Sequence, residues 1–228
     1  MKKQLSISEI KSSEWPQLLQ STLGDNLVSA FLHGDCLMEG HDAFSSPWSI
    51  SFILKDNSTK QLKRLQDLLP KARKSNLEFL YFFTKDEIHA SEDVFPLEFL
   101  HLVNRNETIA GESPLLDFSP NLGCLRLECE RELRGLMIHL RQAYIYINED
   151  KNPLAFFMRA SSTMLPIMYG VHYLINKTYP SNHDEIFVKY PALKTPTVFK
   201  DKDFFLKSVD QYIETVTEII NIVDTLEI

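Results

Sequence analysis

The fold of this chain is decided by two short apolar segments, LVSAFLHGD at residues 27–35 and PWSISFIL at residues 47–54. The first has a short, mostly apolar run over residues 27–32 that ends at His33-Gly34-Asp35, a pattern that predicts a buried strand followed by a turn. The second alternates, so its predicted strand carries Ser49 and Ser51 on one face and larger apolar side chains on the other. Together they predict two strands of one sheet.

Around these two segments, the first half of the chain alternates between helical and strand patterns. The further elements that we expect are helices over residues 7–22 and 58–74 and strands over residues 77–83, 97–103 and 108–110. The resulting order is helix, strand, strand, helix, strand, strand. This order indicates an α/β or α+β domain with a mixed sheet and flanking helices, which we expect to occupy residues 1–120.

The second half, residues 121–228, has the pattern of a helical bundle. Its expected helices cover residues 123–147, 152–177, 184–189 and 201–226. The apolar stripe expected on the first of them consists of Leu127, Leu133, Leu136, Met137, Leu140 and Tyr144. The whole chain is therefore expected to be of the α+β class, with a mixed-sheet domain followed by an all-α domain.

Composition excludes several classes of function. The chain has 228 residues, a net charge of -7 and seven glycines, none of them in a G-x-G or Walker-type phosphate loop. The acidic balance argues against broad nucleic-acid binding, because such binding depends on neutralising phosphates. Three cysteines, an odd number, favour a reduced, cytoplasmic context. We expect no membrane span, since no apolar run reaches about 18 residues.

The segments FLHGD at residues 31–35 and PWSISFIL at residues 47–54 resemble the nucleotidyltransferase superfamily, and so do PLEFL at residues 96–100 and ERELRGL at residues 130–136. In that superfamily a first strand ends in Gly-Ser, and a later strand carries two aspartates as Asp-x-Asp. In kanamycin-type members a helical domain follows. The resemblance implies a nucleotidyltransferase-like mixed sheet followed by a helical bundle.

The resemblance also implies where the site lies and what it has lost. The two aspartates, which hold Mg²⁺ in the family, match Ser49 and Ser51 here, and serine hydroxyls are poor magnesium ligands. The Gly-Ser turn, which binds the nucleotide phosphates, matches Gly34 and Asp35. A carboxylate at that turn repels a triphosphate, by roughly 4 kcal/mol for each like-charge pair about 4 Å apart. We therefore expect a catalytically impaired binding or regulatory module that needs no cofactor and holds no metal.

An alternative is that carboxylates elsewhere have rebuilt the site. Glu78 or Glu98 could supply the family's third carboxylate, and Asp35, Asp42 and Glu98 could together hold a displaced metal ion. The chain would then be an active, Mg²⁺-dependent nucleotidyltransferase. Its reaction would move a nucleoside monophosphate from a nucleoside triphosphate to a small molecule or a protein.

Arginines on the predicted helix over residues 123–147 suggest a second feature. Arg134 and Arg141 are seven residues apart and so share one face, where they could meet a nucleotide or another anionic small molecule in an interdomain cleft. The simpler interpretation is an ion-paired surface, because glutamates at i,i+3 and i,i+4 lie among the arginines. A third hypothesis is a two-component toxin-antitoxin-like system in which the helical domain binds a protein partner.

A serine-hydrolase site is not predicted. Neither Ser49 nor Ser51 has an evident partner histidine and acid in the sequence. His33, which precedes the Gly34 turn, could hydrogen-bond within the cleft, but we expect it to have a structural role.

Overall fold

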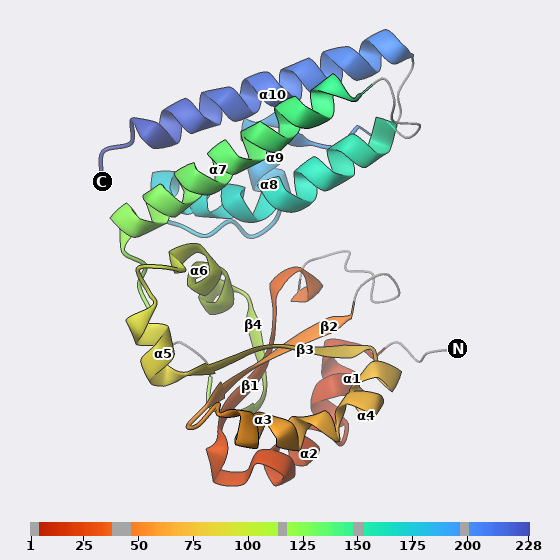
Figure 1. Ribbon diagram of the computed structural model, residues 1–228, viewed down its shortest axis with the longest axis vertical. Coiled ribbons are helices and arrows are strands. Elements are labelled where there is room, and N and C mark those ends of the chain that lie inside the picture. Colours follow the sequence, from red (N-terminus) through yellow and green to blue (C-terminus); the bar gives the residue numbers. More distant parts are fainter. Residues whose placement is uncertain (1–4, 38–46, 114–117, 148–152, 197–200) are drawn as a thin grey trace. The chain divides into compact units, whose positions relative to one another are not determined.

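The computed structural model describes residues 5–37, 47–113, 118–147, 153–196 and 201–228 (Figure 1). The chain divides into two compact units, residues 1–92 with 98–119 and residues 93–97 with 120–228. The first unit is built on a sheet and the second on helices, so the expected α+β class with a mixed sheet and a C-terminal helical region is confirmed. In the described part of the chain, no helix is both long and apolar enough to cross a bilayer.

The sheet of the first unit has four strands in the order β3-β2-β1-β4. Their bounds are Leu27–His33 for β1, Trp48–Leu54 for β2, Leu77–Thr84 for β3 and Asn106–Gly111 for β4. Strand β1 pairs antiparallel with both β2 and β4, and β2 pairs parallel with β3. The four strands correspond to four of the five segments for which the sequence predicts a strand.

The fifth segment, expected as a strand over residues 97–103, is instead the helix α6, Pro96–Asn104. This prediction was wrong because a short apolar run is compatible with either structure. Pro96 suits the first turn of a helix, and the backbone N–H of Leu97 donates to the Glu128 carboxylate at 2.8 Å. Phe99 and Leu102, three residues apart, are both buried on one side of the helix.

Three further differences concern helices of the first unit. The helix expected over residues 7–22 is two helices, and so is the one expected over residues 58–74; both second helices carry a proline in their first turn. A short helix that the sequence did not predict follows β3. The bounds are Ile7–Ser12 for α1, Trp15–Leu23 for α2, Thr59–Gln66 for α3, Leu69–Lys74 for α4 and Lys85–Ala90 for α5.

Helices cover both faces of the sheet. One face packs on a large apolar core that includes Trp15 and Leu19 of α2, Leu65 of α3 and Phe52 of β2. The other face contributes to a smaller core. That core contains Phe31, Ile53, Ile88, Phe99 and Leu102.

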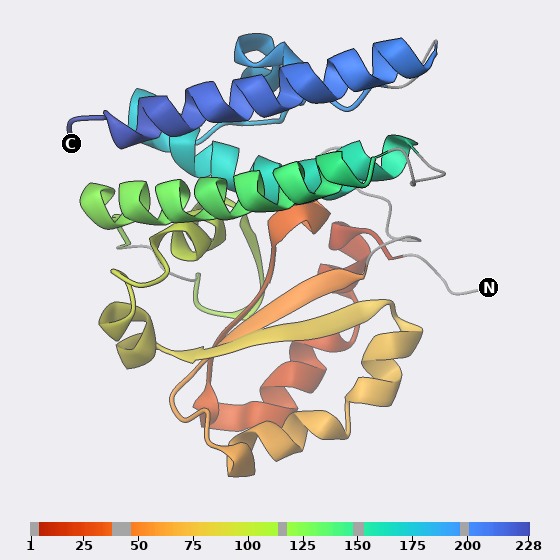
Figure 2. The same ribbon diagram turned by 45° about the horizontal axis from the view of Figure 1, so that its top comes forward.

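The second unit consists of the helices that the sequence predicts. Their bounds are Leu122–Ile145 for α7, Pro153–Asn176 for α8, Asp184–Lys189 for α9 and Lys202–Asp224 for α10. Helix α7 lies alongside α8 and α10 (Figures 1 and 2). Gly170 of α8 permits close packing, because a Cβ atom there would lie only 2.7 Å from Sγ of Cys129.

The stripe predicted for α7 was wrong at two positions. Leu127 is 63% exposed and Tyr144 is 38% exposed, so neither belongs to the buried face. The apolar residues of α7 that are buried are Leu125, Cys129, Leu133, Leu136, Met137 and Leu140. Leu127 lies two residues from both Leu125 and Cys129, and such residues do not share a helix face.

Candidate functional site

The two serines of β2 lie on the sheet face of the smaller core. Trp48, Ile50 and Phe52 belong to the larger core, whereas Ile53 belongs to the smaller one. Because side chains alternate along a strand, Ser49 and Ser51 point to the same side as Ile53. The alternation predicted from the sequence therefore describes the strand correctly.

Ser51 is fully buried and joins three strands through its hydroxyl. Its Oγ lies 2.8 Å from Nε2 of His33, the last residue of β1, and accepts the backbone N–H of Tyr81 on β3 at 3.1 Å. The β2–β3 register is irregular at this point, because Ile50 pairs with Phe79 and Phe52 with Phe82. The hydroxyl of Ser51 thus satisfies a backbone donor beside the irregularity.

His33 is an uncharged imidazole in this arrangement. Its side chain is almost completely buried, and burial lowers its pKa to about 4. The ring stacks on Tyr81, with 5.3 Å between the ring centres. A neutral imidazole and a serine hydroxyl can share one hydrogen bond with either as donor, so the pair needs no ionic partner. We call His33, Ser51 and Tyr81 the Ser-His-Tyr cluster.

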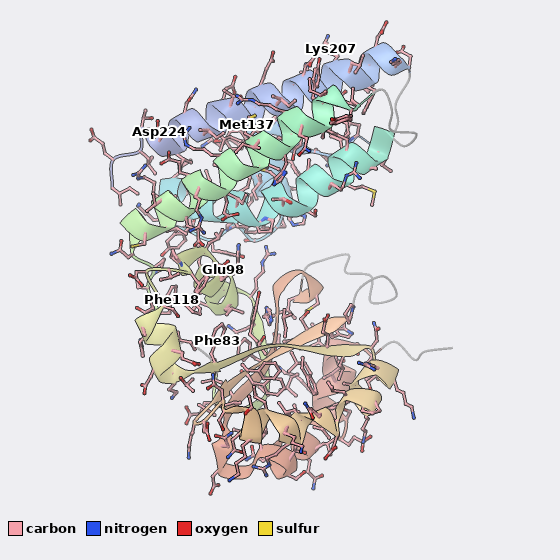
Figure 3. All side chains as sticks on the ribbon, viewed as in Figure 1. Phe83, Glu98, Phe118, Met137, Lys207 and Asp224 are labelled. Atoms are coloured by element: carbon pink, nitrogen blue, oxygen red, sulfur yellow. The ribbon has the colours of Figure 1, made fainter. Side chains whose placement is uncertain are left out.

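Glu98 and Glu78, the candidates for a third carboxylate, are both exposed. Glu98 belongs to helix α6, not to a strand, and is labelled in Figure 3. Burial raises the pKa of Tyr81, and the negative charge of Glu98 raises it further. Glu78 is the register partner of Ser49 across the parallel β2–β3 pair, so their side chains leave the sheet on the same side.

The turn after β1 follows the sequence expectation in its backbone. Gly34 begins a short 3₁₀ turn, Gly34–Leu37, and has a φ of 80°, which glycine adopts without strain. A Cβ atom there would meet nothing within 4 Å, so conformation and not space favours the glycine. The side chain of Asp35 and all of Asp42 lie outside the described residues, and so does the displaced metal set that includes them.

Ser49 and Ser51, at the two positions where the resemblance implies aspartates, do not fit a magnesium ion. Mg²⁺ is bound through carboxylates, and both positions carry neutral hydroxyls here. The hydroxyl of Ser51 is also engaged by His33 and Tyr81. Within the described residues, no three His, Cys, Asp or Glu side chains are grouped so that they could hold a metal ion.

The other half of the same sheet face is apolar and lines a pocket of about 330 Å³. Val28, Ile53 and Phe118 contribute to its lining, together with Lys85 and Glu112, which form an ion pair of 3.2 Å. Phe118 and Phe83, both labelled in Figure 3, pack against the smaller core. This face therefore combines a buried polar cluster with a pocket of mixed lining in the same unit.

The two arginines singled out from the sequence are exposed residues of α7. Arg134 donates to Glu130 at 2.8 Å and lies 3.5 Å from Asp224 of α10, and its guanidinium keeps the pKa of Glu130 below the ordinary value. Arg141 has no ion-pair partner among the described residues. The ion-paired interpretation thus describes Arg134, whereas Arg141 has no such partner in the ranges that the structure describes.

The pairing of Ser51 with His33 is the feature of the candidate site that the sequence did not predict. Phe31 is directly opposite Ser51, so His33 is diagonal to it across the β1–β2 pair. Diagonal neighbours are within reach of a long side chain. The β1–β2 register would have revealed the pair, but the connection over residues 34–47 is too long to fix a register from turn type. Compared with family models and with curated protein sequences, the chain matches none.

Proposed function

We propose that the first unit is a nucleotidyltransferase-like module that has lost metal-dependent nucleotidyl transfer and acts by binding. The observation that carries this proposal is the environment of the Ser51 side chain. At a position where the resemblance implies a magnesium-binding carboxylate, the chain has a buried hydroxyl that is hydrogen bonded to a neutral histidine.

The physical case for lost transfer is that the polar groups satisfy one another. A carboxylate that binds a cation must keep lone pairs directed at open space, whereas the Ser51 oxygen is fully buried and has two partners. A divalent cation beside it would gain no negative charge to offset the loss of its water ligands. Strand β1, the turn at Gly34 and strand β2 follow one another in the order that the resemblance implies, which supports binding as the remaining activity.

Calorimetry with ATP and GTP, with and without Mg²⁺, tests this proposal. We expect the natural chain to show no magnesium-dependent binding in the micromolar range. The double variant Ser49→Asp with Ser51→Asp should acquire such binding, because it restores the missing carboxylates. Ser49→Asn with Ser51→Asn is the matched control, with side chains of the same size and no charge. Circular dichroism establishes that all three proteins are folded.

One observation favours the alternative of an active enzyme. Glu78 leaves the sheet beside Ser49, so a carboxylate is close to the implied metal position. Micromolar, magnesium-dependent binding by the natural chain, with release of pyrophosphate from the nucleotide, would contradict our proposal. Loss of that activity in Glu78→Gln or Glu98→Gln would identify the carboxylate responsible.

A further inference from the structure

Helix α7 carries a second stripe of large side chains on the side away from its buried face. Its members follow one another at intervals of four, three, four, three and four residues, which is the heptad spacing of a helix that pairs with another helix. We call this set the outer stripe. It consists of Leu127, Arg131, Arg134, Ile138, Arg141 and Ile145.

The apolar members of the outer stripe are all exposed. Leu127 is 63% exposed, Ile138 is 66% exposed and Ile145 is 75% exposed. At 100° per residue, the centre of the outer stripe lies roughly 150° around the helix from the centre of the buried face, which includes the labelled Met137 (Figure 3). The stripe extends over about 27 Å, or five turns. The solvent side of a helix is ordinarily polar, so three exposed aliphatic side chains aligned with three arginines there indicate a contact surface.

The charges on the outer stripe are all positive. Arg131 contacts Glu128 and Glu132, and Arg134 contacts Glu130 and Asp224, which lie beside the stripe and not on it. For Arg141 the described part of the chain offers no ion-pair partner. A guanidinium has five N–H donors, so each of these arginines can donate to a further carboxylate.

We propose that the outer stripe is the docking surface for an α-helix of another protein, one that carries aliphatic residues at heptad spacing with Asp or Glu between them. Aliphatic side chains would pack between Leu127, Ile138 and Ile145, and the acidic ones would meet the arginines. The inference goes beyond the proposed function and does not depend on it, because it concerns a different unit.

Charge argues against a second copy of this chain as the partner. If two outer stripes paired antiparallel, Arg131 would face Arg141, and if they paired parallel in register, each arginine would face itself. Both arrangements bring like charges together and cost free energy. An anionic membrane surface is less well matched, since the stripe contains no Trp or Phe.

The test uses the full chain and two fluorescein-labelled synthetic helices of about 25 residues, roughly seven turns. One peptide has Leu and Glu alternating at the heptad positions, and the other has Lys in place of Glu. In fluorescence anisotropy we expect saturable binding of the Glu peptide. The Lys peptide should bind at least about tenfold more weakly, which is ~1.4 kcal/mol.

Variants locate the binding on α7. Ile138→Asp and Arg141→Glu, both at exposed positions, should each weaken binding of the Glu peptide at least about tenfold, ~1.4 kcal/mol. Val188→Asp is the matched control, because Val188 of α9 is 84% exposed and lies off the stripe, and it should leave binding unchanged. Thermal denaturation establishes that the variants are folded.

Four outcomes would overturn the proposal. Absence of saturable binding, or equal binding of the two peptides, would show that an acidic helix is not the partner of the outer stripe. In sedimentation, a dimer of the natural chain that Ile138→Asp dissociates would make a second copy the partner. Binding to anionic phosphatidylserine vesicles that the same variant abolishes would make the stripe a membrane contact.

Discussion

The two faces of the sheet in the first unit are built on different principles. The face that packs on α1 to α4 is apolar along its length, with Ile50, Phe52 and Leu54 of β2 all buried in the larger core. The opposite face is apolar at one end, around Phe31 and Ile53, and polar at the other, where the Ser-His-Tyr cluster lies.

The difference shows on which face of the sheet polar side chains can be buried. On the first face, burial of apolar area supplies free energy, and a polar group would have no partner. On the second face, His33 and Ser51 can be buried because each satisfies the other. The stability that a hydrogen-bonded cluster contributes depends more on the presence of each member than on pH near neutrality. Substitutions can therefore distinguish the two faces experimentally.

The largest effect should come from the apolar face. Phe52→Ala removes a fully buried ring that stacks on Phe82 at 5.3 Å, and we expect the free energy of unfolding to fall by about 3–5 kcal/mol. Urea denaturation followed by circular dichroism measures it. Leu80→Ala at an exposed position of β3 is the control and should cost less than about 1 kcal/mol. A loss of under about 1 kcal/mol for Phe52→Ala would show that this face is not the stabilising one.

The next effect is a loss of stability at acidic pH. The folded-state pKa of His33, about 4, is below the ordinary value of 6.5, so the unfolded chain binds the extra proton first. The contribution of His33 to the free energy of unfolding is therefore complete above about pH 6.5 and falls by about 3 kcal/mol as the pH is lowered through about 4. Denaturation at a series of pH values measures it.

His33→Gln keeps a hydrogen-bonding side chain but cannot take up this proton, so its stability should lose that part of the pH dependence. His139→Gln, at an exposed position, should retain the full slope. An unchanged slope in His33→Gln would mean that His33 is not the buried titrating group.

Removal of a single hydroxyl should have an intermediate effect. Ser51→Ala leaves Nε2 of His33 and the N–H of Tyr81 without this partner, and we expect a loss of about 1–3 kcal/mol in the free energy of unfolding. Ser49→Ala, two residues away on the same face, is the matched control and should change stability by less than about 0.5 kcal/mol. Equal losses in the two variants would contradict a special role for Ser51.

The smallest effect tests the electrostatics of the polar end. Glu98→Gln removes the second of the two causes that raise the pKa of Tyr81, so this pKa should fall part of the way towards its ordinary value while burial keeps it raised. Carbon NMR of the tyrosine Cζ atoms, assigned with Tyr81→Phe, follows the titration. Glu107→Gln provides the comparison, and an identical shift in both variants would argue against a specific effect of Glu98.

How much of this structure can be predicted from the sequence depends on whether the determining pattern is local or involves residues distant in sequence. Alternation in β2 and the aromatic run in β3 are local, and they located both strands correctly. The segment from Leu97 to Val103 was misassigned, because a short apolar run is compatible with a strand or a helix, and its contact with Glu128, which accepts the N–H of Leu97, is distant in sequence. The candidate positions Ser49 and Ser51 came from a short pattern, whereas the partnership of Ser51 with His33 depends on strand register, which no short pattern encodes.

The irregular pairing beside Tyr81 has a consequence for solubility. Strand β3, LEFLYFFT, pairs with β2 alone in the described sheet and carries a single charge, a composition that favours intermolecular β-sheet and amyloid-like aggregation. An irregular strand is a poor template for a second chain, because its free amides do not follow a regular repeat. By accepting the N–H of Tyr81, the Ser51 hydroxyl supports that irregularity, which makes β3 a poorer partner for a strand of a second chain.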